Sequence, residues 1–333
     1  MKTLIIAEAG VNHNGSLKLA KKLINEASKT GADVIKFQIY DTEELVTKYS
    51  KVAKYQQKNI NSKKSQYEML KNYELDFQTF REIINHCKLK RIKFLASAFD
   101  INSIKKLNDL KINSFKIPSG EITNYTYLKY LGKLNKKIII SSGMSNIKEI
   151  EAAINLLKSS GTKKSNITVM HCTTDYPTKI KEVNLRAMLT IKKKLGVKVG
   201  YSDHTKNIEV PIAAIALGAT IIEKHLTLNS KSKGPDHKAS LEPKSFKEMV
   251  RNIRNTEILL GSNVKKITNS EKRNIVAVRK SLVACKTINK GDIIKSFHLT
   301  AKRPGNGINP MKINKIIGKT ANKKYLKNEQ IKL

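Results

Sequence analysis

The sequence predicts a (β/α)8 barrel followed by a small β-rich domain. Eight short apolar runs, typical of buried strands, alternate with segments that carry apolar residues at helical spacing within residues 1–262. Polar residues suited to chemistry follow these runs, as they do at the carboxyl ends of barrel strands. After residue 262 a polar stretch leads into short alternating runs and glycine-containing turns. An open, doubly wound parallel sheet is the competing architecture.

Turn and cap residues mark the boundaries of the barrel elements. The first strand ends in E-A-G-V-N-H-N-G, Ser16 caps the following helix, and Gly31 ends that helix. Asp100 begins the helix after the third strand. Further helices are predicted over 77–90, 208–217 and 243–260. The predicted strands are 4–8, 34–38, 92–97, 114–117, 138–142, 167–171, 197–201 and 219–223.

One long insertion interrupts the strand–helix repeat. Residues 41–75 are polar and lysine-rich and include Tyr49, Tyr55 and Tyr67. Loops of this length are usually functional or mobile.

The small domain follows a polar linker over residues 263–275. The domain itself covers 276–333, with an alternating run over 276–285 and a rigid R-P-G-N-G loop that begins at Arg303. A domain of this size has little core of its own, so we expect it to pack on another surface.

Composition narrows the class of protein. The chain has 64 Lys and Arg against 27 Asp and Glu, a net charge of +37. Such a charge suits nucleic-acid binding, but the lysines are spread along the whole chain, which favours a general lysine-rich bias that would help capture an anionic substrate. Three widely spaced cysteines without C-x-x-C indicate reduced thiols. No apolar run approaches the roughly 20 residues of a membrane helix, and the first apolar run is too short for a signal peptide, so we expect a cytoplasmic protein.

Polar side chains gather at or just beyond the carboxyl ends of the predicted strands. They are Glu8, Lys36, Gln38, Ser97, Lys116, Ser119, Glu121, Ser141, Ser142, His171, Tyr176, Ser202, His204 and His225. Because the carboxyl ends of parallel strands meet at one face of a barrel, we expect these residues to share one pocket.

Two histidines end neighbouring predicted strands. His204 and His225, with Ser202, Asp203 and Asp236 nearby, form a reasonable start for a divalent metal site. A structural role for one of the two histidines is the alternative. A metal held there would act as a Lewis acid on a carbonyl oxygen.

The lysines and serines at the strand ends suit an anionic, phosphorylated substrate. Lys36 and Lys116 could neutralise a phosphate. Hydroxyl donors are available from Ser97, Ser119, Ser141 and Ser202, and the P-S-G-E and S-S-G-M loops let backbone N–H groups approach an anion. Glu8 and Glu121 are the candidate acid and base.

Two other functions compete with this interpretation. One is a Schiff-base aldolase on the same barrel, with Lys36, Lys116 or Lys224 as nucleophile. The other is a nucleic-acid-binding protein with a degenerate barrel, whose binding would depend steeply on salt.

The motifs together resemble those of the sialic acid synthase family, the phosphoenolpyruvate-condensing nonulosonate synthases. They include I-A-E-A-G-V-N-H-N-G-S, V-I-K-F-Q, F-K-I-P-S-G-E, H-C-T-T-D-Y-P, G-Y-S-D-H-T, G-P-D-H-K-A-S-L-E-P and K-R-P-G-N-G, in order along nearly the whole chain. The C-terminal segment resembles the family's antifreeze-like (SAF) domain. The resemblance implies an N-acetylneuraminate synthase-type condensation of phosphoenolpyruvate with an open-chain N-acylated mannosamine, giving a nine-carbon 2-keto acid and phosphate. The alternative it implies is N,N'-diacetyllegionaminate synthesis from 2,4-diacetamido-2,4,6-trideoxymannose.

The resemblance also implies roles for individual residues. His204 and His225 would bind Mn²⁺, with Mg²⁺ or Co²⁺ as alternatives. Phosphoenolpyruvate would be held by Lys36, Ser97, Lys116, Ser119, Ser141 and Ser202. Gln38, Tyr176 and Asp236 would contact the amino sugar, and Glu8 would hold the substrate or a water on the metal. Arg303, from the swapped C-terminal domain of a homodimer partner, would close the site; no nucleic acid or membrane is involved. Glu121 is our candidate for stabilising the cation at C2 or guiding water.

Three positions depart from the family pattern. Thr174 stands where some members have Asn, Ser97 where many have Thr, and Ala98 where many have Pro. Ser97 keeps the hydroxyl group of the family's Thr. Thr174 lacks the amide with which the Asn of other members lies near the phosphate.

Overall fold

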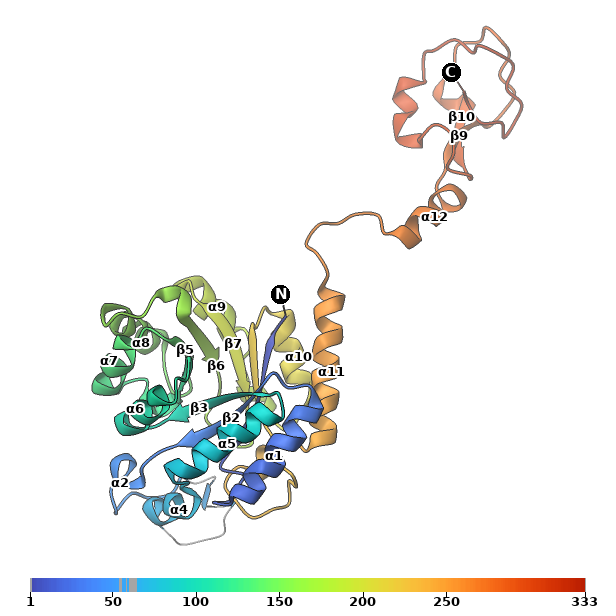
Figure 1. The fold of residues 1–333 in the computed structure, drawn as a ribbon. Coiled ribbons are helices and arrows are strands. Elements are labelled where there is room, and N and C mark those ends of the chain that lie inside the picture. Colours follow the sequence, from blue (N-terminus) through green and yellow to red (C-terminus); the bar gives the residue numbers. More distant parts are fainter. Residues whose placement is uncertain (1, 54–55, 58, 60–64, 333) are drawn as a thin grey trace. The chain divides into compact units, whose positions relative to one another are not determined.

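The computed structural model describes residues 2–53, 56–57, 59 and 65–332. The chain divides into two compact units, Met1–Gly261 and Ser262–Leu333, which are described separately below (Figure 1). In the part of the chain that the structure describes, no helix combines the length and apolar character needed to cross a bilayer.

The first unit is a closed barrel of eight parallel strands. The strands are β1 (Leu4–Gly10), β2 (Val34–Ile39), β3 (Lys93–Ala98), β4 (Ser114–Ile117), β5 (Lys137–Ser141), β6 (Ile167–His171), β7 (Lys198–Asp203) and β8 (Ile221–His225). β1 pairs with both β2 and β8, which closes the sheet on itself. The predicted (β/α)8 barrel is therefore confirmed, and the doubly wound open sheet is wrong.

Helices surround the barrel and return the chain to the start of the next strand (Figure 1). They are α1 (Leu17–Thr30), α5 (Phe77–Leu89), α6 (Ile101–Asp109), α7 (Tyr125–Lys133), α8 (Ile147–Ser159), α9 (Ala187–Leu195), α10 (Glu209–Ala216) and α11 (Pro243–Leu260). The predicted caps hold: the side chains of Ser16 and Asp100 accept backbone N–H groups of the first turn, and Gly31 ends α1 with φ of 85°. The main core lies between the strands and these helices.

The insertion at 41–75 contains helices that the polar sequence did not predict. They are α2 (Thr42–Leu45) and α4 (Gln66–Tyr73). Asp41 caps α2, and Ser65 with Glu68 forms a capping box on α4, so short polar side chains begin both helices. Of the tyrosines expected in this loop, Tyr49 is exposed and the Tyr67 hydroxyl donates to Glu43, whereas Tyr55 lies outside the described residues.

The second unit begins with α12 (Asn269–Val278), followed by an antiparallel pair, β9 (Ser281–Ala284) and β10 (Leu299–Lys302). A helix begins inside the predicted linker, at the capping box of Thr268 and Glu271, and continues through residues 276–278 of the predicted alternating run. A separate apolar cluster supports this unit, made of Leu282, Ala284, Ile288, Ile294, Leu299, Ile316, Ala321, Tyr325 and Ile331. The small domain thus has a core of its own.

Candidate active site

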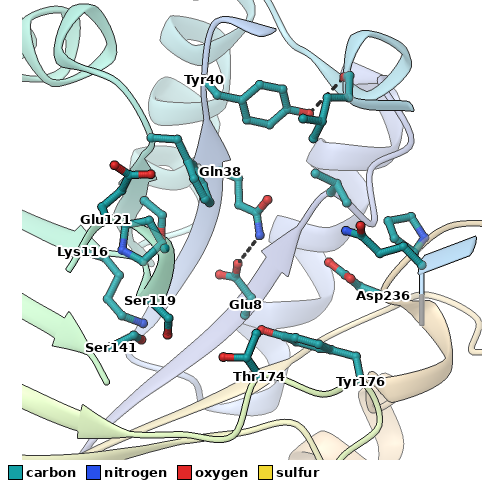
Figure 2. A pocket seen from close by; sticks show the side chains of 18 of the residues that line it. Glu8, Gln38, Tyr40, Lys116, Ser119, Glu121, Ser141, Thr174, Tyr176 and Asp236 are labelled. Carbon is teal, nitrogen blue, oxygen red and sulfur yellow. Dashed lines mark hydrogen bonds between the residues drawn. The ribbon is translucent and has the colours of Figure 1, made fainter. Parts of the chain in front are cut away.

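A pocket of about 300 Å³ opens at the carboxyl ends of the barrel strands. Nearly all of the residues predicted for the site line it (Figure 2). They are Glu8, Lys36, Gln38, Ser97, Lys116, Ser119, Glu121, Ser141, Tyr176, Ser202, His204, His225 and Asp236. Two strand-end residues do not belong to the lining: Ser142 donates to Met170 O, and a ring nitrogen of His171 bonds Val183 O.

The pocket lies one layer above an apolar floor inside the barrel. The floor is made of Ile6, Val34, Leu95, Ile139, Met170 and Ile221, which pack together. Residues i and i+2 of a strand face the same side, so the residue two positions after each floor residue also faces the barrel interior. Those positions are Glu8, Lys36, Ser97, Ser141, Cys172 and Glu223. Strand periodicity therefore builds the site directly on the barrel core.

Two buried lysines share one carboxylate at the base of the pocket. Lys116 Nζ donates to both carboxylate oxygens of Glu223, at 2.9 and 2.8 Å. Lys36 Nζ lies 3.3 Å from Glu223 Oε1 and 3.2 Å from Glu8 Oε2. It also donates to Ser97 Oγ at 3.0 Å. β2, β4 and β8 thus meet at Glu223.

The charges in this cluster do not balance evenly. Burial would raise the pKa of Glu223, but Lys116 and Lys36 outweigh burial and hold that pKa well below its usual range. Burial raises the pKa of Glu8 to about 7, against the charge of Lys36. Burial would lower the pKa of Lys36, yet the attraction of Glu223 and Glu8 leaves it raised, whereas burial does lower the pKa of Lys116. Near neutral pH two lysines thus face one ionised carboxylate and a partly protonated Glu8, an arrangement that favours an anion.

The two strand-end histidines face the same pocket, with ring centroids 5.5 Å apart. His204 Nδ1 bonds Thr173 O at 2.6 Å; because a carbonyl only accepts, Nδ1 carries the proton and Nε2 the lone pair. Ser202 Oγ lies 3.3 Å from that Nε2, but it donates its proton to Glu223. The lone pair of His204 is thus available for a ligand.

His225 presents a second unused nitrogen. Its Nδ1 is buried, has no hydrogen-bond partner among the described residues, and lies 4.0 Å from Asp236 Oδ2. Burial lowers the pKa of His204 to about 4 and that of His225 well below its usual value, so both rings are neutral at pH 7. Neutral imidazole is the form that binds metal. Within the described ranges, no three His, Cys, Asp or Glu side chains are grouped to hold a metal. The two imidazoles are the candidate donors for an ion.

A glycine loop covers the serine side of the pocket. Gly143 N donates to Ser119 Oγ at 3.1 Å. A Cβ at Gly143 would lie 2.1 Å from Thr174 Oγ1, so only glycine allows this approach. Thr174 Oγ1 is itself buried without a hydrogen-bond partner in the described part of the chain. Glu121 ends the short turn Ser119–Glu121, where burial raises its pKa although Asn124 donates to it at 2.7 Å.

Glu8, Gln38 and Asp236 converge on the opposite side of the pocket (Figure 2). Gln38 Nε2 donates to Glu8 Oε1 at 3.5 Å. Gly10, with φ of 52°, gives these side chains room, because a Cβ there would lie 3.3 Å from Glu8 Oε1 and 3.4 Å from Asp236 Oδ2. The ring of Tyr176 stacks on His204 with centroids 4.0 Å apart.

The insertion supplies an outer wall that sequence reasoning missed. This wall includes Leu45, Val46, Met69, Leu70 and Tyr73, and it meets Tyr40, which directly follows β2. Met69 is almost fully buried although it lies in a polar helix, and the Tyr40 hydroxyl donates to Leu70 O at 3.2 Å. The apolar residues scattered among the polar ones of the insertion were the available signal.

Glu223 is the functional residue that sequence reasoning missed inside the barrel. Its signal was its place two residues before His225 in a strand, which puts both on one face. The same alternation turns Lys224 and Asp203 away from the pocket. Outside the lining they form an ion pair with each other at 2.6 Å. Lys224 is therefore excluded as a pocket nucleophile.

Arg303 belongs to the second unit. It is the first residue of the R-P-G-N-G loop. Its Nε donates to Val278 O at 3.0 Å, and its side chain is exposed.

Comparison with known proteins identifies the family. Residues 23–265 match the NeuB family, and residues 279–333 match the SAF domain. The chain belongs to the NeuB family. It is therefore an enzyme of the NeuB type, and the predicted family and C-terminal SAF domain are confirmed.

Named relatives of this NeuB family member cover almost its whole length. It is 51% identical over 331 residues to the N,N'-diacetyllegionaminic acid synthase of Campylobacter jejuni, covering 99% of each chain. It is 34% identical to the human N-acetylneuraminate-9-phosphate synthase, covering 95% of this chain and 87% of the human protein. Among solved structures, an N-acetylneuraminic acid synthetase from Leptospira borgpetersenii in complex with citrate matches with a TM-score of 0.72 and 33% identity, covering 83% of this chain and 90% of that one.

Proposed function

We propose that the chain condenses phosphoenolpyruvate with an open-chain N-acylated mannosamine-type sugar, giving a nine-carbon 2-keto sugar acid and phosphate. The observation that carries the proposal is the pair of buried lysines around Glu223, next to two neutral histidines in one pocket. The lysines suit the anionic substrate, and the histidines suit an ion that activates the sugar. We also propose that the reaction takes place in the cytoplasm.

Phosphoenolpyruvate would bind between β2 and β4. Lys36 and Lys116 supply its positive partners, and the Glu223 carboxylate between them keeps the two ammonium groups in place before the anion arrives. Hydroxyl donors surround this position, from Ser97, Ser119, Ser141 and Ser202. The Thr174 hydroxyl, which has no hydrogen-bond partner among the residues that the structure describes, adds a further donor toward the same side.

His204 Nε2 and the free nitrogen of His225 would hold a divalent ion, which we propose is Mn²⁺. When bound, such an ion polarises the sugar carbonyl as a Lewis acid. Tyr176, stacked on His204, limits the direction from which the sugar can approach.

The reaction forms one carbon–carbon bond and releases phosphate. The enol carbon of phosphoenolpyruvate attacks C1 of the open-chain sugar, the former aldehyde oxygen takes a proton, and C2 takes water as phosphate leaves. Glu8, whose pKa of about 7 lets it give or take a proton near neutrality, is the candidate for the proton at C1. Glu121 ends the pocket-lining turn Ser119–Glu121 and is the candidate for guiding the water to C2 of the product.

Two amino sugars fit the proposal. The 51% identity to a diacetyllegionaminic acid synthase favours 2,4-diacetamido-2,4,6-trideoxymannose slightly, and the apolar outer wall of the pocket suits its methyl groups. N-acetylmannosamine is the second candidate, supported by the N-acetylneuraminic acid synthetase structure.

The test incubates the enzyme with phosphoenolpyruvate, Mn²⁺ and each sugar in turn. We expect phosphate release together with a nine-carbon keto acid identified by mass, fastest with the diacetamido sugar. Borohydride is added to a parallel reaction. A lysine adduct trapped there, without phosphate release, would instead establish the Schiff-base aldolase.

Lys116→Ala is expected to raise KM for phosphoenolpyruvate more than KM for the sugar. The lost charge-assisted contact should cost about 1.5–3 kcal/mol, roughly a 10- to 150-fold change. Steady-state kinetics with each substrate varied separately measures both constants, and KM for the sugar serves as the internal control. An unchanged KM for phosphoenolpyruvate would show that the anion binds elsewhere.

We further propose a homodimer in which Arg303 of one subunit closes the pocket of the other. Arg303→Ala and His225→Ala variants, each nearly inactive, should then recover activity when mixed under conditions that exchange subunits. Random pairing gives mixed dimers with one intact site, about a quarter of wild-type activity. If labelled subunits exchange but activity does not return, Arg303 acts within its own chain or not at all.

A further inference from the structure

Lys224 is completely buried on the side of β8 that faces away from the pocket. Its ammonium group has three hydrogens, and the structure gives them three strong acceptors. Nζ lies 2.6 Å from Asp203 Oδ2, donates to Asn207 O at 3.0 Å, and donates to Thr205 O. The hydrogen-bonding capacity of the lysine is therefore fully used.

All of these acceptors belong to residues 203–207, the segment that joins β7 to α10. The segment is also tied internally, because Asp203 Oδ1 accepts from Thr205 N at 2.9 Å and Thr205 Oγ1 accepts from Asn207 N at 3.3 Å. His204 lies inside this segment, between two residues that Lys224 holds. Lys224 thus fixes the backbone on both sides of a pocket imidazole.

The imidazole of His204 is fixed from a different direction. Its Nδ1 donates to Thr173 O at 2.6 Å, and its own carbonyl accepts from Thr178 N at 3.0 Å. The β6 side thus sets the ring orientation, while Lys224 sets the position of the backbone that carries the ring. On β8, Lys224 directly precedes His225, so one strand positions both histidines.

A fully buried ion pair contributes little to folding compared with an apolar pair of the same size, because both charges lose their hydration. Its geometric effect is the better account of this pair. The geometry points to Lys224 as a positioning residue that holds the 203–207 segment so that His204 and His225 converge on one point. The inference rests on the proposed function, in which those two rings hold a divalent ion.

The test measures Mn²⁺ binding directly, without turnover. Lys224→Met keeps the length of the side chain and removes its donors, and the free Mn²⁺ signal in electron paramagnetic resonance gives the affinity. We expect the affinity to fall tenfold or more, since residues that orient metal ligands typically contribute on that scale. The affinity for phosphoenolpyruvate, measured by calorimetry without metal, should stay within about twofold because Lys36 and Lys116 lie on other strands.

Arg254→Met is the matched control. The partly exposed Arg254 forms ion pairs with Asp33 at 2.7 Å and Glu257 at 3.0 Å, and it also donates to Thr3 O, near the start of β1. Its replacement should lower stability and leave Mn²⁺ affinity unchanged. If Lys224→Met does not fold, Asp203→Asn decides the question, because it keeps the shape of the side chain and replaces the charged acceptor of Lys224; it should lower Mn²⁺ affinity in the same direction.

Each outcome has one meaning. Wild-type Mn²⁺ affinity in Lys224→Met, or in Asp203→Asn where that variant decides, overturns the positioning role and leaves the proposed function standing. An equal fall in the affinities for Mn²⁺ and phosphoenolpyruvate also overturns it, because the loss is then one of general structure. If the wild-type enzyme binds no Mn²⁺, the metal assignment fails, and the role of Lys224 fails with it.

Discussion

Glu223→Gln is expected to lower the free energy of unfolding of the barrel by about 3–5 kcal/mol, because the change leaves two buried ammonium groups without their shared counter-charge. Lys116 and Lys36 both lie within 3.3 Å of the Glu223 carboxylate. The chain has no tryptophan, so urea unfolding is followed by far-ultraviolet circular dichroism. Activity should fall as well, since the lysines lose the group that positions them.

A second substitution separates charge from shape. Adding Lys116→Met to Glu223→Gln removes the ammonium group that loses its carboxylate partner, whereas Lys36 still lies 3.2 Å from Glu8 Oε2. The double variant should recover more than half of the lost stability, while activity stays low. The control is Glu257→Gln, which weakens an ion pair with the partly exposed Arg254 and should cost about 1 kcal/mol. A Glu223→Gln barrel as stable as wild type would contradict the idea that the two lysines depend on this carboxylate.

The double variant His204→Ala, His225→Ala is expected to lose activity by about a thousandfold or more, corresponding to about 4 kcal/mol of transition-state stabilisation. Chelation of the wild-type enzyme should have a similar effect, and Mn²⁺ should reverse it in the wild type but not in the double variant. The measurement is initial rate at saturating substrates after exhaustive chelation.

His171→Gln is the control for a general effect of removing a histidine. His171 lies at the end of β6 but bonds Val183 O and does not line the pocket. It should keep most of its activity and its response to Mn²⁺. Full turnover by the double variant after chelation would rule out a catalytic role for an ion at these histidines.

The order of the barrel elements could be predicted because it depends on short-range patterns. Buried strands are visible in the sequence as apolar runs, and their period of two residues determines which side chains face inward. Caps such as Ser16 and Asp100 act within one helical turn, so they too are visible in the sequence. Since parallel barrel strands end at one face, the predicted strand-end residues had to come together, and most of them line one pocket.

Local patterns failed where two structures suit the same residues. Val276 and Val278 alternate as in a strand, yet they end α12, because the capping box at Thr268 and Glu271 begins a helix that runs through them. In the insertion, the polar sequence hid Met69, whose burial follows from the position of α4 against the barrel. The burial of Met69 depends on residues distant in the chain, whereas α12 begins at a capping box that is present in the sequence itself.

The sequence by itself determined the barrel, the residues at its carboxyl end and the family to which the chain belongs. The tertiary structure decided which charges meet. Glu223 lies 107 residues from Lys116 in the chain, and only closure of the barrel brings their strands close enough for a 2.8 Å ion pair. The tertiary structure also gives three consecutive residues of β8 different surroundings. Glu223 and His225 face the pocket, whereas Lys224 faces the segment that carries His204. Charge pairing acts through space, so it becomes defined only when the sheet closes.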